Sequence, residues 1–254
     1  IAEVSGADTL VELGSGTSDK TRVILDAMVE AGTLERYVPF DVAEGTLREA
    51  VDMIAARYPG VVVHGVVGDF ERHLDRIPGG GRRVFALLGG TVGNFAPAER
   101  RRLLGQISAT MAPGDSFVLG TDLVKDRRRL VAAYDDAAGV TAAFNVNVLS
   151  VLNRELDADF DPEGFEHVAL FDDDHEWIEM RLRSKADQTV RVAELDLVVH
   201  FDAGEELRTE ISAKFRRTGV VDELASVGLD LECWWTDQAG DYALSLSRRR
   251  APTG

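Results

Sequence analysis

The first half of the chain alternates short apolar runs with segments whose apolar residues recur at helical spacing. The runs predict five strands, at Thr9–Leu13, Arg36–Phe40, Val61–Val67, Val84–Leu88 and Ser116–Thr121. The segments between them predict helices over Ser18–Ala31, Glu44–Tyr58 and Pro97–Met111, each followed by a Gly or Pro-Gly stop. The unbroken run at Val61–Val67 is typical of a buried parallel strand. Strand–helix alternation predicts a parallel sheet with right-handed crossovers.

The pattern changes after Lys125. Residues 127–160 have helical spacing, and residues 165–215 alternate apolar and polar positions as antiparallel strands do. The expected strands are His167–Phe171, Trp177–Leu182, Thr189–Phe201 and Glu206–Phe215. A helix at Val220–Val227 and two strands, Asp230–Thr236 and Tyr242–Ser247, then close the chain. We expect residues 248–254 to be a frayed tail.

This order of elements resembles the class I methyltransferase layout, an α/β fold in which a Rossmann-like parallel sheet ends in a helix and an antiparallel hairpin. Residues 1–125 and 215–254 would form that domain, and residues 126–214 an inserted α+β domain. An insertion before the terminal hairpin is a natural place for substrate recognition.

A glycine-rich turn follows the first strand, with Gly14, Ser15 and Gly16 between the strand and the next helix. Glycines allow a ligand to approach the backbone closely, and a helix N-terminus attracts an anion. In a dinucleotide enzyme the anion is a pyrophosphate; in a methyltransferase it is the carboxylate of the methionine moiety. Asp19 stands where a third glycine would be, which disfavours NAD. By itself the motif could be an ordinary tight turn.

Acidic residues follow the next two strands. Asp41 ends the second strand, where a carboxylate can accept hydrogen bonds from ribose hydroxyls; the alternative is a helix N-cap. Asp69 and Phe70 follow the third strand and could present an acceptor and an aromatic face to an adenine; the alternative is a simple turn. Since ligands of open α/β sheets bind at the carboxyl ends of the strands, the three signals together favour a nucleoside-bearing ligand.

Two further stretches are candidates for the acceptor substrate. The segment Gly89–Phe95 follows the fourth strand, where small residues leave room for a substrate and Asn94 offers both a donor and an acceptor. It could instead be a turn in which Asn94 caps a helix. Glu210 and Ser212 share one face of a strand and could bind an N–H-bearing ring, although a solvated strand face is the simpler interpretation.

Composition narrows the class of protein. A formal net charge of −16 argues against nucleic acid as a partner. No apolar run approaches the length of about 20 residues that a membrane span needs. The five histidines show no metal-ligand spacing, so we expect no metal. We expect a cytoplasmic monomer. Because the chain begins at Ile1 rather than Met, we also expect a segment before it.

Long stretches of the chain resemble the histidine Nα-methyltransferases of ergothioneine biosynthesis. The resemblance covers nearly the whole chain and is carried by VELGSGTSDKT at 11–21, PFDV at 39–42, GDFE at 68–71, LGGTVGNF at 88–95, GTDLVKD at 120–126, AYDDAAGVTAAFNVNVL at 133–149, NRELDADFD at 153–161, FDAGEELRTEISAKF at 201–215 and WWTDQAGDYALSL at 234–246.

The resemblance implies trimethylation of the α-amine of L-histidine to hercynine, with S-adenosylmethionine as methyl donor. It implies that the donor is held by Gly14, Ser15, Gly16, Lys20, Asp41, Asp69 and Phe70. Around the amino and carboxylate groups of histidine it places Gly89, Asn94, Tyr134 and Thr141, and facing the imidazole Met180, Glu210 and Ser212. In the family, tyrosines from a stretch before residue 1 help to close the substrate site.

Other functions stay open at this point. The same fold could act on another amino acid or a small amine. An NAD-dependent oxidoreductase is disfavoured by the missing third glycine and the terminal hairpin. A non-catalytic protein that senses S-adenosylmethionine would carry the donor-binding residues without turnover.

Overall fold

The computed structural model describes residues 1–250. The chain divides into two compact units. The first consists of Ile1–Leu123 together with the chain from Phe215 onward, and the second of Val124–Lys214.

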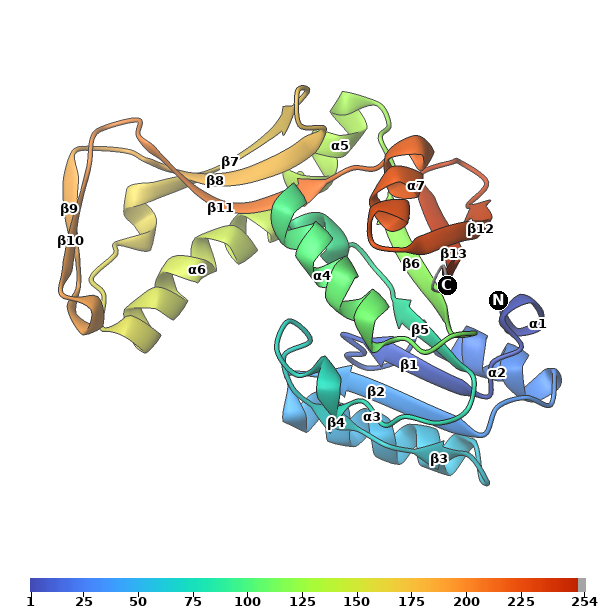
Figure 1. Ribbon diagram of the computed structural model, residues 1–254. Coiled ribbons are helices and arrows are strands. Elements are labelled where there is room, and N and C mark those ends of the chain that lie inside the picture. The colour runs from blue at the N-terminus through green and yellow to red at the C-terminus, as the bar shows by residue number, and fades with distance from the viewer. Residues whose placement is uncertain (251–254) are drawn as a thin grey trace. The chain divides into compact units, whose positions relative to one another are not determined.

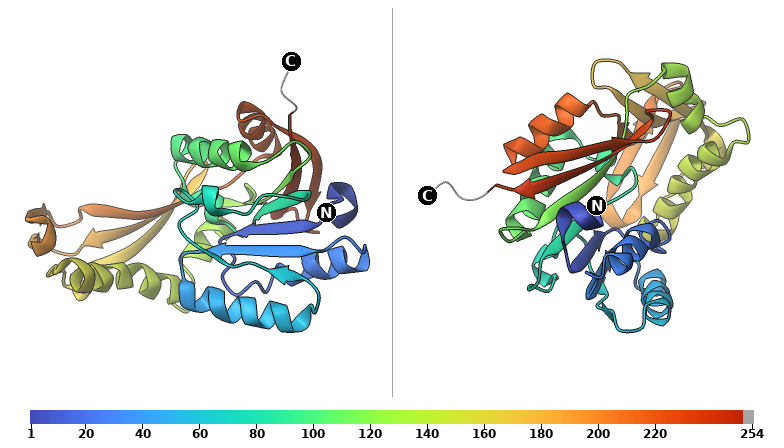
Figure 2. Two further views of the ribbon diagram at one scale, coloured as in Figure 1. Left: turned by 60° about the horizontal axis from the view of Figure 1, so that its bottom comes forward. Right: turned by 90° about the vertical axis from the view of Figure 1, so that its right-hand side faces the viewer.

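The first unit is built on one twisted sheet (Figures 1 and 2). Its strand order is β12-β13-β6-β5-β1-β2-β3, with β4 also pairing with β2. The strands are β1 (Thr9–Leu13), β2 (Arg36–Asp41), β3 (Val62–Val63), β4 (Val66–Val67), β5 (Arg83–Leu87), β6 (Ser116–Asp122), β12 (Leu229–Thr236) and β13 (Tyr242–Arg249). Only β13 runs antiparallel to the rest, because it pairs antiparallel with both β6 and β12. The parallel sheet closed by an antiparallel hairpin is the arrangement expected from the sequence.

Helices precede or connect the strands of this sheet. They are α1 (Ala2–Ser5), α2 (Arg22–Glu30), α3 (Glu44–Arg57), α4 (Pro97–Thr110) and α7 (Arg217–Ser226), with short 3₁₀ turns η1 (Leu74–Arg76) and η2 (Thr91–Asn94). Every residue of β1 and of β5 is buried. Burial on both faces explains why these central strands are apolar runs rather than alternating sequences. It also places their carboxyl ends, where the candidate residues lie, on a rigid base.

The predicted third strand is wrong in its extent and burial. Residues 61–67 form two short strands, β3 and β4, at the edge of the sheet, and the side chains of Val62 and Val67 are 61% and 42% exposed. Gly65 lies between them, and a Cβ there would come within 3.0 Å of a methyl group of Val51 on α3. An apolar run alone cannot distinguish an edge strand from a buried one.

Two chain segments next to the sheet also differ from expectation. Helix α2 begins at Arg22 instead of Ser18, because Ser18 adopts a left-handed conformation and its amide donates to the Ser15 carbonyl in a turn. The expected frayed tail is wrong for residues 248–250: β13 extends to Arg249, and Arg250 pairs with Asp230. Residues 251–254 lie outside the described residues.

The second unit packs helices against antiparallel strands. Helices α5 (Arg127–Tyr134) and α6 (Val140–Leu156) contact a sheet of order β11-β8-β7. These elements are labelled in Figure 1. Its strands are β7 (Phe165–Asp172), β8 (Trp177–Ser184) and β11 (Glu206–Ala213), and a short 3₁₀ turn, η3 (Pro162–Gly164), leads into β7. The helical stretch 127–160 is thus two helices, separated by a turn in which Gly139 has a φ of 70°.

The single strand predicted over Thr189–Phe201 is wrong. It is a hairpin of β9 (Gln188–Val192) and β10 (Leu197–Phe201), joined through the 3₁₀ turn η4 (Ala193–Leu195). Asp196 takes the left-handed conformation that closes the turn. Because the turn contains neither glycine nor proline, the alternation of apolar and polar residues conceals it.

Strand β8 has two different faces. Ile178, Met180 and Leu182 are buried among apolar side chains of the second unit. The residues between them belong to the other face, where Glu179 and Arg181 form an ion pair. In the antiparallel register, Glu210 of β11 lies opposite Met180 and Ser212 opposite Ile178. Directly opposed residues share a face, so Glu210 and Ser212 point to the same side as this apolar cluster.

Candidate functional site

The glycine-rich loop after β1 is fixed by the end of β2. Gly14 and Gly16 have φ values of 71° and 49°, which favour glycine. The amides of Gly14 and Ser15 donate to the Phe40 carbonyl at 2.8 and 3.2 Å. The Gly16 amide donates to the Asp41 carboxylate at 2.8 Å. Two neighbouring strand ends therefore set the shape of the loop together.

A cavity of about 280 Å³ opens on this loop. It is lined by Glu12, Gly14, Ser15, Gly16, Thr17, Asp19, Lys20, Leu88 and Gly89. The Ser15 side chain is only 7% exposed, and its hydroxyl has no hydrogen-bond partner within residues 1–250. Buried hydroxyls in native proteins are nearly always satisfied by protein, water or ligand. An unpartnered hydroxyl in a cavity that Lys20 also lines fits an anionic ligand.

A buried carboxyl group lies beneath the loop. Glu12 is 4% exposed and accepts hydrogen bonds from the hydroxyls of Thr21 and Tyr37, the latter at 2.5 Å. The Tyr37 hydroxyl also lies 2.8 Å from the Ser18 hydroxyl. Burial raises the pKa of Glu12 to about 7, and raises that of Tyr37 well above its ordinary value. This network joins β1 and β2 to the turn before α2. The sequence did not single out Glu12, because a residue near the end of a strand has no local signal that distinguishes it from other strand positions.

The structure places the other expected donor residues near the same loop. Phe70 lies next to Gly14, since its ring is 3.9 Å from where a Cβ on that glycine would be, and it packs edge-on against Phe95 with the ring centroids 6.4 Å apart. Asp41 accepts a second bond, of 2.9 Å, from the Ala43 amide. Asp69 accepts from the Glu71 amide at 2.8 Å and pairs with Arg72. Asp41 and Asp69 therefore each stabilise a turn, and each carboxylate keeps acceptor positions that these bonds do not use.

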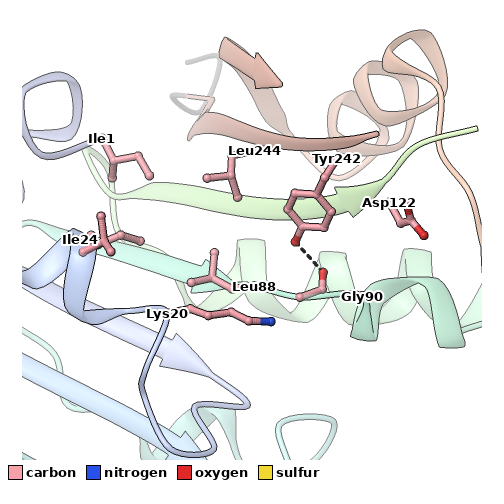
Figure 3. Close-up of a pocket in the computed structure, with 10 residues that line it drawn as sticks. Ile1, Lys20, Ile24, Leu88, Gly90, Asp122, Tyr242 and Leu244 are labelled. Atoms are coloured by element: carbon pink, nitrogen blue, oxygen red, sulfur yellow. Dashed lines mark hydrogen bonds between the residues drawn. The ribbon is translucent and has the colours of Figure 1, made fainter. Parts of the chain in front are cut away.

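A second and larger cavity, of about 650 Å³, borders Gly89 and Gly90 (Figure 3). The Tyr242 hydroxyl donates to the Gly89 carbonyl at 2.8 Å. Gly120 makes that bond possible, because a Cβ there would come within 2.0 Å of the same hydroxyl. Tyr242 was not among the residues expected from the sequence. Its contact with residue 89, 153 positions away, leaves no local signal.

Asn94 is the last residue of η2, and its side chain is exposed. The helix that follows, α4, has Ala96 as its N-cap, and the Glu99 side chain accepts from the Ala96 amide at 3.1 Å. The alternative in which Asn94 caps that helix is therefore wrong. The Asn94 amide group is left for another role.

In the second unit, Tyr134, Ser212 and Lys214 form a polar cluster. The Tyr134 and Ser212 hydroxyls lie 2.7 Å apart, and Lys214 Nζ lies 2.9 Å from both. The same ammonium group stands 4.7 Å from the centre of the Tyr134 ring. The structure thus brings together two of the residues expected from the sequence and adds Lys214, which is only 4% exposed.

Glu210 lies on the same strand face as this cluster. Burial raises the pKa of its carboxyl, and the nearby charge of Lys214 opposes that rise. Within residues 1–250, no hydrogen bond or ion pair engages the Glu210 side chain. Met180, opposite it, belongs to an apolar cluster with Leu130, Phe171 and Ile178. A partly buried carboxylate beside an apolar wall suits a ring that carries an N–H group.

Thr141 lies in the first turn of α6. Its amide donates to the Asp136 carboxylate at 2.8 Å, and the Val140 amide donates to the same group at 3.1 Å. These bonds and one from the Thr141 side chain hold the pKa of Asp136 at about 2. The turn that carries Thr141 is therefore anchored by a carboxylate that stays ionised.

Residues 1–250 contain no group of three or more His, Cys, Asp or Glu side chains arranged to hold a metal ion. No helix in that range combines the length and apolar character that a membrane span requires.

The chain is similar in sequence to known methyltransferases. A family model described as a histidine-specific, S-adenosylmethionine-dependent methyltransferase matches residues 1–249. Over 249 residues the chain is 60% identical to a histidine N-alpha-methyltransferase of Mycolicibacterium smegmatis and 55% identical to one of Mycobacterium tuberculosis. Each match covers 98% of this chain and 78% of the relative.

Among solved structures, an S-adenosylmethionine-dependent methyltransferase from Clostridium acetobutylicum matches with a TM-score of 0.54. That match has 11% sequence identity and covers 98% of this chain and 88% of the other. At such low identity the likeness concerns the fold alone, and it confirms the class I methyltransferase fold expected from the sequence.

Proposed function

The chain belongs to the histidine-specific, S-adenosylmethionine-dependent methyltransferases, and from that premise we propose that it trimethylates the α-amine of L-histidine to hercynine. The observation that carries the proposal is the extent of the match, since it includes the second unit, which generic methyltransferase motifs do not describe. The product would serve ergothioneine biosynthesis, as in the family that the sequence resembles.

We assign the donor site to the cavity at the glycine-rich loop. The unpartnered Ser15 hydroxyl and Lys20 would hold the methionine carboxylate, and the backbone at Gly14 and Gly16 would allow its close approach. Asp41 keeps free acceptor positions for ribose hydroxyls while it holds the loop. Asp69 and Phe70 would meet the adenine. Bound there, the donor supplies a methyl group on a positively charged sulfur.

We assign histidine recognition residue by residue, as the family resemblance implies. Gly89, Asn94, Tyr134 and Thr141 would meet its amino and carboxylate groups. Glu210 would accept a hydrogen bond from the imidazole N–H, with Met180 against the ring and Ser212 beside it. Within residues 1–250 the Glu210 carboxylate has no hydrogen-bond or ion-pair partner and is available for that bond, and a substrate without a ring N–H would leave its charge unpaired. Residues 124–214 would thus serve as the substrate-recognition domain.

The reaction depends mainly on the alignment of the reacting atoms. Methyl transfer from a sulfonium is an in-line displacement, so nitrogen, methyl carbon and sulfur must lie on one line at near-attack distance. The attacking amine must be neutral, and its proton would leave to water, with Asn94 and the Tyr134 hydroxyl orienting the nitrogen. The small residues Gly89 and Gly90 would leave room for the mono- and dimethylated intermediates. No side chain is assigned as a dedicated base.

Calorimetric titration tests both halves of the proposal. S-adenosylmethionine and L-histidine should each bind with one site per chain, without added metal, and turnover should require both. Binding of the donor without turnover in the presence of histidine would contradict the assignment. We further propose that the protein is a cytoplasmic monomer, which light scattering at working concentration tests for the oligomeric state.

A further inference from the structure

A buried amide in the second unit joins elements that are distant in the sequence. Asn145 on α6 is 3% exposed. Its Nδ2 lies 2.9 Å from His167 Nδ1 on β7 and 3.1 Å from the Arg181 carbonyl on β8. Its Oδ1 lies 2.6 Å from the Thr209 hydroxyl on β11. The side chain therefore makes hydrogen bonds to all three strands of the sheet.

The direction of each hydrogen bond follows from the donors available. Both N–H groups of the Asn145 amide are used, so Oδ1 must accept from the Thr209 hydroxyl and His167 Nδ1 must be an acceptor. The proton of the neutral imidazole is then on Nε2, which donates to the Tyr134 carbonyl at 2.8 Å. That carbonyl belongs to the last residue of α5 and lacks a partner within the helix. The chain of bonds thus runs from Thr209 to the backbone of Tyr134.

Thr209 is the extra residue of a β-bulge. Arg208 lies opposite Arg181 and Glu210 opposite Met180, so two steps along β11 match one step along β8. The Thr209 hydroxyl also lies 2.9 Å from the Met180 carbonyl, so its single proton is shared between that carbonyl and Asn145 Oδ1, the nearer acceptor. The bulge places Arg208 and Glu210 on opposite faces, although residues two apart on a regular strand share one.

The separation of these two residues has a chemical consequence. On the Arg208 face, Glu179 is already paired with Arg181 and Arg208, the latter at 3.0 Å. A Glu210 side chain on that face would lie among arginines. On its actual face it lies near Lys214, and among residues 1–250 its carboxylate has no ion-pair partner.

We infer that Asn145, His167 and Thr209 form a positioning hub that fixes the β11 bulge and the end of α5, and thereby sets Glu210 and Tyr134 for histidine recognition. This inference rests on the proposed function, because only there do Glu210 and Tyr134 meet the substrate. None of the three hub residues was expected to matter from the sequence.

Thr209→Val tests the hub with little change of side-chain shape, and Thr209→Ser, which keeps the hydroxyl, is the matched control. Losing one positioning hydrogen bond should raise the KM for histidine about tenfold in Thr209→Val. The dissociation constant for S-adenosylmethionine should stay within about twofold, and Thr209→Ser should restore the KM. A merely structural role would lower stability or active fraction but leave the histidine KM unchanged, and that result would overturn the inference. Should Thr209→Val not fold, His167→Phe replaces it, with the same increase in KM expected.

A measurement independent of the substrate separates this inference from the proposed function. Nitrogen-15 chemical shifts of the His167 ring should show a neutral imidazole protonated on Nε2, and Asn145→Leu should change them. A proton on Nδ1 instead would overturn the hub whichever acceptor the enzyme uses. Absence of histidine turnover in the wild-type protein, with the Nε2–H form present, would instead contradict the proposed function and leave the hydrogen-bond network intact.

Discussion

The Asp41 carboxylate accepts a hydrogen bond of 2.8 Å from the Gly16 amide, across 25 residues of sequence. A residue expected to touch the ribose of the donor thus also shapes the loop that would hold the methionine carboxylate. One side chain thus links the ribose part of the donor site to the loop for the methionine carboxylate. A change at Asp41 should therefore weaken donor binding more than the loss of a single ligand contact would.

Asp41→Ala should therefore weaken S-adenosylmethionine binding about a hundredfold, because it removes both a charge-assisted bond to the ribose and the support of the loop. Asp41→Asn keeps one acceptor oxygen and should weaken binding less. Titration calorimetry measures both variants. Unaltered affinity in Asp41→Ala would count against the ribose assignment.

Ser15→Ala should weaken binding of the methyl donor without lowering the stability of the fold. The Ser15 hydroxyl is buried and has no protein partner within the described residues, so its removal should cost no stability. Donor affinity should fall by about tenfold, the value of one hydrogen bond to a charged group. Thermal unfolding and calorimetry on the same preparation check the two halves. A variant that loses stability but binds the donor normally would show that the hydroxyl serves the fold.

Glu12→Gln should change how stability depends on pH. The pKa of Glu12 is raised from 4.5 to about 7 in the folded protein, so the folded state holds this proton more tightly than the unfolded chain does. The protonated Glu12 makes its full contribution to the free energy of unfolding below pH 4.5, and this contribution is lost as the pH rises to about 7. The loss amounts to at most about 3 kcal/mol.

Glutamine imitates the protonated acid, so the variant should lack this loss. Urea unfolding of both proteins between about pH 5 and pH 8 should show the wild type losing stability relative to Glu12→Gln up to about pH 7 and no further above it. Parallel curves for the two proteins would refute the role given to the Glu12 proton.

Glu210→Ala should lower kcat/KM for histidine by about tenfold or more, as expected for the loss of a charge-assisted hydrogen bond. Donor affinity should not change. Glu194→Ala, at an exposed turn of the same unit, provides the matched control. An unchanged kcat/KM in Glu210→Ala would end its assignment to the imidazole.

Local patterns predicted most of the fold. Burial on both faces makes β1 and β5 mostly apolar, and glycine stops mark the ends of the first helices, so these elements were found close to their true bounds. The pattern failed at Val62 and Val67 because an edge strand can be as apolar as a central one. It failed at η4 because Asp196 turns the chain without glycine or proline.

The residues of the candidate site, too, could be predicted only where a local sequence signal marks them. Gly14, Gly16 and Asp41 were found because a strand end followed by glycine, or by an acid, is a local signal. Glu12, Tyr242 and Lys214 depend on partners far along the chain, such as the Tyr242 hydroxyl on the Gly89 carbonyl. The identity of the acceptor came from the family resemblance, since a carboxylate on a strand does not by itself name a substrate.

Mass spectrometry of reactions with S-adenosylmethionine and a panel of amino acids tests the central claim most directly. The panel should contain L-histidine, its α-N-methylated forms, and other aromatic and basic amino acids. The account predicts that histidine alone gains three methyl groups on its α-nitrogen. Methylation of the imidazole, of another amino acid in preference to histidine, or of none would contradict it.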